Sequence, residues 1–184
     1  EKTLAFMRLL GMLMTDGSVG TAEYGEKFRY SVYAGHKLDM ESICRDIELL
    51  GAKPNPMKQK HCWHISLPLS CFSGVHKLRG IDVGKRKNKE SQLPEFLFED
   101  CPLPIIREFL GGLYGGDGHA PTYSNPAGAF SSIGFSLTKS EDFVDNGIEY
   151  TKQIGLLLSR FDISHTVNLR NPSRKKEGGD KEIL

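Results

Sequence analysis

The sequence predicts an α+β protein made of two similar halves, each with the order helix–strand–strand–helix–strand–strand–helix. The first observation behind this prediction is an internal repeat, in which LLGMLMTDG (residues 9–17) recurs as LGGLYGGDG (residues 110–118), offset by 101 residues. The second is the pattern after each copy: segments whose apolar residues alternate, as in half-buried strands, and then a segment with helical apolar spacing. Four strands in each half would form one antiparallel sheet with one buried face and one wet face.

The elements of the first half are indicated by local patterns. The alternation of Phe28, Tyr30 and Val32 with polar neighbours predicts a strand, and Trp63, Ile65 and Leu67 form one face of another. We therefore expect strands within 18–35, a helix over 37–52 that ends at Gly51, a hairpin over 54–68 and a short helix over 69–81.

The second half repeats this course up to the end of the sequence. We expect strands at 119–124 and 130–138, a helix over 140–161 with Ser140 as its N-cap, and a strand over 163–170. By comparison with the first copy, most of a last strand and a closing helix are lacking, so we expect this half to be incomplete at its C-terminus. The predicted division is a first half at 1–80, a polar, lysine-rich linker at 81–103 and a second half at 104–184.

Composition limits the class of protein. The chain has 184 residues, 39% of them hydrophobic, which is enough for a core in one or two domains. No run of about 18 apolar residues occurs, so we expect no membrane span. The four cysteines show no CxxC pairing, which favours reduced thiols and an intracellular location, whether nucleus, organelle or cytoplasm. The formal net charge of +1 gives no global field for a polyanionic partner, although basic residues cluster locally.

Small residues recur four apart in both motif helices. Gly11 and Thr15 have this spacing in the first, and Gly112 and Gly116 in the second. Such a row leaves a groove through which two helix backbones can approach each other. Glycine within a helix costs about 1 kcal/mol relative to alanine, so close packing would supply the compensating gain. We expect the two motif helices to lie side by side through these four residues.

The same packing would bring two carboxylates together. Asp16 and Asp117 end the two helices, where the partial negative charge of the helix dipole already lies. A cation must neutralise this cluster, and hard carboxylate and carbonyl oxygens suit Mg²⁺. Gly17 and Gly118 are expected to take positive φ and turn the chain into the next strand. One Asp–Gly pair alone would be read as an ordinary turn, but its duplication favours a metal site.

The two nonapeptides resemble the LAGLIDADG motif, and the whole chain resembles a LAGLIDADG homing endonuclease core in its single-chain, two-motif form, especially the endonuclease domains of inteins. The resemblance implies two αββαββα halves joined through the motif helices, with two sheets forming a saddle on double-stranded DNA. It also implies a monomer that cuts both strands of a long asymmetric target. The implied metal ligands are the carboxylates of Asp16 and Asp117 and the backbone carbonyls of Thr15 and Gly116. The family often has a lysine beside each metal site; its usual slot here is Ser91, so Lys89 is the nearest candidate.

A wet sheet face and basic loops would contact the DNA. Basic side chains would bind phosphates, and polar strand residues would read base edges in the major groove. The other interpretation is that these charged loops are simply solvated. The candidates are Lys27, Arg29, Ser31, Tyr33, Lys58, Lys60, His61, Ser132, Ser136, Arg170 and Arg174.

Two functions remain open from the sequence. The first is a site-specific double-stranded DNA endonuclease that uses Mg²⁺. The second is a non-cleaving nucleic-acid binder on the same fold, either an RNA maturase or a DNA-binding regulator. Retention of both motif aspartates favours cleavage, because a binder has no use for two carboxylates near phosphates. A zinc site among His61, Cys62, His64, Cys71 and His76 is disfavoured, since their spacing fits no common site.

Overall fold

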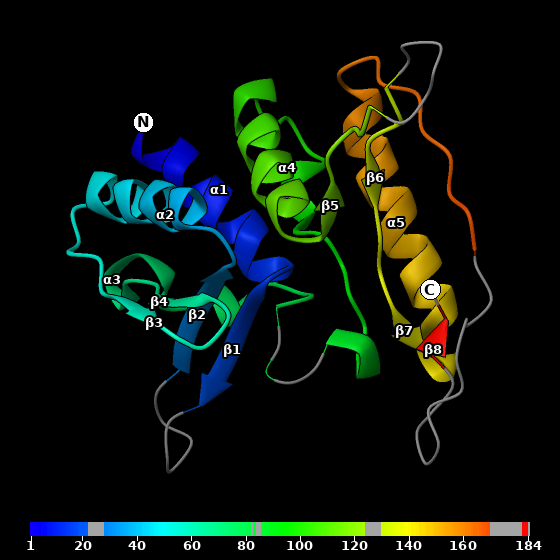
Figure 1. The fold of residues 1–184 in the computed structure, drawn as a ribbon. Helices are drawn as coiled ribbons and strands as arrows, with labels where there is room; N and C mark the ends of the chain where they lie inside the picture. Colours follow the sequence, from blue (N-terminus) through cyan, green and yellow to red (C-terminus); the bar gives the residue numbers. More distant parts are fainter. Residues whose placement is uncertain (22–27, 82, 84–85, 124–129, 170–181, 184) are drawn as a thin grey trace.

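The computed structural model describes residues 1–21, 28–81, 83, 86–123, 130–169 and 182–183 (Figure 1). Its α-helices are α1 (Lys2–Met14), α2 (Lys37–Leu49), α3 (Leu69–Phe72), α4 (Leu103–Asp117) and α5 (Val144–Ser159). Its strands are β1 (Gly17–Thr21), β2 (Phe28–Ala34), β3 (Pro56–Lys58), β4 (Trp63–Ser66), β5 (Gly118–His119), β6 (Gly134–Phe135), β7 (Lys139–Ser140) and β8 (Glu182–Ile183). Short 3-10 helices are η1 (Val75–Lys77), η2 (Arg86–Asn88), η3 (Glu95–Leu97) and η4 (Glu141–Phe143).

The first half contains the predicted four-stranded antiparallel sheet, with strand order β1-β2-β4-β3. Val32 lies opposite Ile65 in the register of β2 and β4, and both side chains are fully buried. Helices α1 and α2 cover this face of the sheet (Figure 1). Helix α2 ends at Leu49, and Gly51, with a φ of +87°, caps it as predicted. The N–H of Gly51 donates to the carbonyl of Glu48 and that of Ala52 to the carbonyl of Ile47, which is a Schellman cap.

The four-stranded sheet predicted for the second half is wrong for the described residues. These form two separate two-stranded sheets, β5-β6 and β7-β8. The expected strand over 163–170 has no regular structure in its described part, 163–169, where Ile163 and Leu169 are 49% and 58% exposed. The segment 130–138 contains three serines and one glycine, and only Gly134–Phe135 is a strand there. Among the described residues no strand pairs with 163–169, so this segment gains no cross-strand contacts from an extended conformation.

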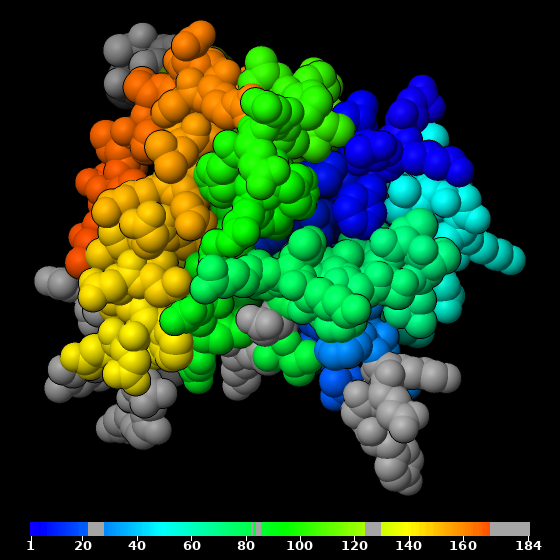
Figure 2. Space-filling view, turned by 180° about the vertical axis from the view of Figure 1, so that it is seen from behind, coloured from blue at the N-terminus to red at the C-terminus, as the bar shows by residue number. Residues whose placement is uncertain are grey.

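Helices α1 and α4 lie side by side at the centre of the molecule (Figure 1). A Cβ added at Gly11 would collide with the backbone of Phe109 and Leu113, and one added at Gly112 would collide with the backbone of Arg8. The two helix backbones are therefore in direct contact at these glycines. From the opposite side, α4 and the residues before it (green) lie between the first half and residues 130–169 (yellow to orange) (Figure 2).

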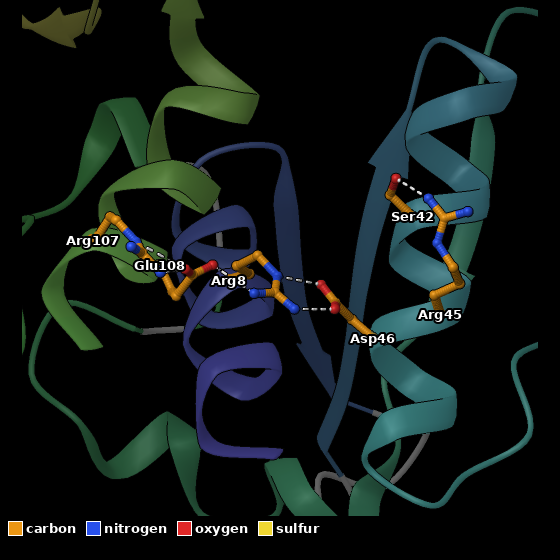
Figure 3. A network of polar contacts seen from close by, with 6 residues as sticks. All are labelled: Arg8, Ser42, Arg45, Asp46, Arg107 and Glu108. Carbon is orange, nitrogen blue, oxygen red and sulfur yellow. Dashed lines mark hydrogen bonds and ion pairs between the residues drawn. The ribbon is translucent and has the colours of Figure 1, made fainter. Parts of the chain in front are cut away.

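A polar cluster ties three helices together beside this seam (Figure 3). From α1, the Arg8 guanidinium donates to both carboxylate oxygens of Asp46 in α2, at 2.5 and 2.9 Å. It also donates to Glu108 of α4 at 2.5 Å, and Arg107 donates to the other oxygen of Glu108 at 2.7 Å. The hydrogen bond from Arg8 is the main reason that the pKa of Glu108 is lowered. Arg8 of α1 therefore links α2 to α4 through charge-assisted hydrogen bonds.

Among the described helices, none is both long and apolar enough to cross a bilayer.

Candidate functional site

The two motif aspartates lie at the ends of the paired helices. Helix α1 ends at Met14, two residues before Asp16, and α4 ends at Asp117 itself. Helix α4 packs directly against the chain at Thr15 and Asp16. A Cβ added at Gly116 of α4 would collide with the side chain of Thr15 and lie 3.1 Å from the backbone nitrogen of Asp16. The hydroxyl of Thr15, which is buried, donates back to the carbonyls of Gly11 and Met12. The structure thus brings Asp16, Thr15, Gly116 and Asp117 to one place.

The backbone carbonyl of each aspartate accepts a hydrogen bond from a residue further along its own half, Tyr33 in β2 for Asp16 and Ser136, just after β6, for Asp117. The backbone N–H of Tyr33 donates to the carbonyl of Asp16 at 3.2 Å, and the N–H of Ser136 donates to the carbonyl of Asp117 at 3.3 Å. These are matching contacts in the two copies of the motif. In both halves the backbone of the aspartate is therefore tied to a later segment of the chain.

The glycine after each aspartate has a different role from the one predicted. A Cβ at Gly17 would collide with the backbone of Leu13, and one at Gly118 with the backbone of Tyr114. The φ of Gly118 is −83°, and Gly17 is not among the described glycines with positive φ. The expectation of left-handed turns is therefore wrong. Glycine is needed here because the chain folds back across the last turn of its own helix.

The charges of the two carboxylates act on each other. The pKa of Asp16 is raised, first by partial burial of its carboxylate and next by the charge of Asp117, whereas Arg86 opposes the shift. Two carboxylates that repel each other in this way are stabilised by a positive charge placed close to both.

Arg86 is a cation that contacts this cluster. Its Nη1 donates to Oδ2 of Asp117 at 2.6 Å and to the backbone carbonyl of Met14 at 3.0 Å. A longer contact of 3.5 Å joins Nη2 to Oδ1 of Asp117. An open pocket beside Asp16 is lined by Ser18, Arg86 and Lys89 among other residues. The candidate Lys89 therefore borders the same pocket as Asp16.

The residues present fit a hard divalent cation better than zinc. In the part of the chain that the structure describes, no three His, Cys, Asp or Glu side chains gather in a metal-binding group. A pair of carboxylates with nearby backbone carbonyls is instead the donor set that Mg²⁺ uses, because this ion keeps several of its waters. Asp16 and Asp117 would hold it, with the carbonyls of Thr15 and Gly116 as further candidates.

The candidate DNA-contacting residues of the first half do not all lie on the same face of its sheet. In β2, exposed Arg29 and half-buried Tyr33 lie on the face opposite Val32, and Tyr33 contacts the ring of His64 across the sheet at 5.3 Å between centroids. Ser31 is on the same face but is only 8% exposed. From the sequence, His64 was weighed as a disfavoured zinc ligand and is not among the candidate DNA contacts above, although its alternation with Trp63 and Ile65 indicates this face.

Lys58 lies on the other face of that sheet. It is opposite Trp63 in the register of β3 and β4, and its ammonium lies 4.8 Å from the Trp63 ring centroid. Lys60 and His61 are exposed in the turn between these strands. In the second half, Ser132 is exposed, and the hydroxyl of Ser136 contacts the ring of His119 at 2.9 Å. The candidates Lys27, Arg170 and Arg174 lie outside the described residues.

Comparison with known proteins gives two kinds of match. No protein-family model matches the chain. The chain is 28% identical over 180 residues to the tRNA-splicing ligase RtcB of Methanocaldococcus jannaschii and 26% identical over 179 residues to that of Methanopyrus kandleri. Each match covers 87% of this chain but only 18% or 17% of the relative. The replication factor C small subunit of M. jannaschii is 22% identical over 95% of this chain and 10% of its own length.

Solved structures match over the full chain. Mesophilic variants of the homing endonuclease I-DmoI align with a TM-score of 0.55 and 13% identity over 100% of this chain and 89% of theirs. I-DmoI in complex with DNA and Mn gives 0.55 with 11% identity over the same shares. I-WcaI bound to its DNA recognition sequence gives 0.54 with 14% identity over 98% of this chain and 74% of its own. The chain has the fold of the LAGLIDADG homing endonucleases, the family whose motif its two central helices resemble.

Proposed function

We propose that the chain is a site-specific double-stranded DNA endonuclease that hydrolyses phosphodiester bonds with Mg²⁺ at Asp16 and Asp117. The observation that carries this proposal is that two carboxylates lie at one end of a glycine-packed helix pair, where the backbone carbonyl of each aspartate accepts a hydrogen bond from a later residue of its half. A buried structural role would favour neutral side chains there, since the carboxylates repel each other.

The relatives support an endonuclease rather than a ligase. A tRNA-splicing ligase and a replication factor subunit have different functions by name, yet both match nearly all of this chain. The chain spans less than a fifth of either relative. Such different proteins share this segment, and it is short compared with each of them. This is the pattern expected of an element inserted into unrelated host proteins. This supports an intein-type origin and argues against assigning the ligase activity to the chain.

In the proposed reaction, each group of the chain has a defined task. Asp16 and Asp117 would hold a divalent ion, which when bound would activate a water and stabilise charge on the scissile phosphate. The hydrogen bonds from the N–H groups of Tyr33 and Ser136 hold the backbone of the two aspartates in place. Lys89, beside the same pocket, would bring positive charge to the phosphate. Arg29 and Tyr33 would contact the DNA from the open face of the first sheet.

Cleavage of a pooled library of DNA sites tests the proposal. Double-strand breaks at one long site in Mg²⁺ are expected, and sequencing the cut ends identifies it. Asp16→Asn and Asp117→Asn should each lower the cleavage rate by about a hundredfold or more, because metal stabilisation of the transition state is worth several kcal/mol. The matched control is Asp100→Asn, an exposed aspartate away from the seam.

The non-cleaving alternative predicts a different result. Specific binding to DNA or to folded RNA, with no metal-dependent cutting and no effect of Asp16→Asn, would contradict an endonuclease and identify a regulator or a maturase.

A further inference from the structure

Residues 86–93, called here the bridging segment, are fastened to the second half by side chains from β7 and α5. Hydrogen bonds join the segment to four different residues of these elements. From β7, the ammonium of Lys139 donates to the carbonyls of Arg86 and Lys89 and to the hydroxyl of Ser91, and the hydroxyl of Ser140 donates to the carbonyl of Lys87. From α5, the side-chain amide of Asn146 bonds both backbone groups of Ser91, and that of Gln153 accepts from the N–H of Leu93.

Lys139 is the unusual member of this set. The residue is only 3% exposed, and its ammonium donates to three oxygens at 2.9, 2.6 and 2.7 Å, none of which is a carboxylate. An ammonium has three protons, so these bonds use all of them. Burial, followed by the positive charges of Arg86 and Lys89, lowers the pKa of Lys139 to about 8. Burying a cation without a carboxylate is costly, which calls for a role beyond filling space.

The position of Arg86 supplies that role. Lys139 holds the backbone carbonyl of Arg86, while the side chain of the same residue reaches across the seam to the carboxylate of Asp117 and the carbonyl of Met14. Arg86 is thus anchored at its backbone in the second half and bound at its guanidinium to both motif helices. A flexible arginine would lose rotamer freedom in making such contacts, and a fixed backbone reduces that loss.

We propose that Lys139 is a positioning residue that holds Arg86 as the resident counter-ion of Asp117, so that a divalent cation binding at the two aspartates competes with a guanidinium. The inference deepens the proposed function and rests on it for the identity of the cation site. It assigns a role to the bridging segment, which lies outside the two nonapeptide motifs.

Manganese titration of the whole chain tests the proposal, with free Mn²⁺ measured by electron paramagnetic resonance. Arg86→Gln should lower the dissociation constant by about threefold to tenfold, the range expected for loss of a competing, partly exposed ion pair. Arg86→Lys, which keeps the charge, should stay near the wild-type value. Arg79→Gln removes an exposed arginine that pairs with Glu95 at 3.7 Å, and should change nothing.

A double-mutant cycle tests the positioning role. Lys139→Met should tighten Mn²⁺ binding in the same direction as Arg86→Gln, and should add nothing in the Arg86→Gln background, because it acts through Arg86. Lys152→Met, which removes an exposed lysine from α5, is the control. If Lys139→Met does not fold by circular dichroism, Ser91→Ala removes one partner of the ammonium and should give a smaller shift of the same sign.

The outcomes separate this inference from the proposed function. Unchanged Mn²⁺ affinity in Arg86→Gln, or additive effects in the cycle, overturns the inference while the endonuclease proposal stands. Mn²⁺ binding that is as strong in Asp16→Asn as in the wild type overturns the cation site itself, and the inference with it.

Discussion

Strands β1 to β4 make one continuous sheet after α1, whereas the described strands after α4 pair only two at a time. Yet the two motif helices end in the same way. The backbone carbonyl of each aspartate accepts a hydrogen bond from a residue in or next to a later strand, and each aspartate precedes a glycine that lies against its own helix. The difference teaches that the geometry at the helix ends does not require a complete sheet. It depends on a few strand residues next to the aspartate and on the seam between α1 and α4.

The largest effect is expected at the seam, which both halves share. Gly112→Val would drive a branched side chain into the backbone of Arg8, and the free energy of unfolding should fall by about 3 kcal/mol or more. Urea denaturation monitored by circular dichroism measures it. Gly111→Ala is the matched control, since nothing lies within 4 Å of its Cβ; it should stabilise α4 by about 0.5–1 kcal/mol. Equal effects at the two positions would refute direct backbone contact.

The two halves can be compared through one isoleucine in each. Ile65 of β4 is fully buried, so Ile65→Ala should cost about 2–5 kcal/mol in urea denaturation. Ile133, in the segment before β6, is 65% exposed, so Ile133→Ala should change the stability by less than about 0.5 kcal/mol. A large loss at Ile133 would mean that the second half has a sheet core in solution.

Arg8 tests whether the halves are coupled beside the seam. Arg8→Met keeps much of the volume but leaves the carboxylates of Asp46 and Glu108, which are 12% and 15% exposed, without their cation. We expect a loss of about 1–3 kcal/mol, less than for a fully buried pair because the Arg8 side chain is 33% exposed. Arg45→Met is the control, because the guanidinium of that residue donates to the hydroxyl of Ser42 within the same helix (Figure 3).

The smallest effect is a dependence on pH. The pKa of Glu108 is lowered in the folded state, so its contribution to stability is present above the ordinary glutamate value of 4.5 and is lost as the pH falls through the folded value. Thermal unfolding between pH 6 and 3 should therefore show a steeper decline for the wild type than for Arg8→Met. Parallel curves would contradict the coupling of Arg8 to Glu108. The pH limits of about 3 and 6 bracket carboxylate titration.

The features that could be predicted from the sequence are local. Alternation along β2 and β4 and the helical spacing of α2 specify the first sheet and its cover, because each pattern reports burial of consecutive residues. Asp16 and Asp117 were identifiable because they belong to a repeat. The second sheet failed as a prediction because alternation signals a strand but not the presence of a partner strand.

The residues that contact the two aspartates could not be predicted from such local patterns. Arg86 lies 31 residues before Asp117, and Lys139 lies 53 residues after Arg86, so their contacts depend on the path of the bridging segment. In the sequence, Arg86 was one basic residue in a lysine-rich stretch and Lys139 carried no signal. Lys58 shows a further limit: the register of β3, not its charge, places it over Trp63.

The direct contact between the backbones of α1 and α4 has a further consequence. Because no side chain separates the helices at Gly11 and Gly112, the spacing of Asp16 and Asp117 is set by the peptide chain itself. Residues elsewhere can then vary without moving the two acidic groups relative to each other. The glycine contact therefore fixes the separation of the two aspartates, and the surrounding surfaces can change in sequence, and so in the ligands they bind, without altering it.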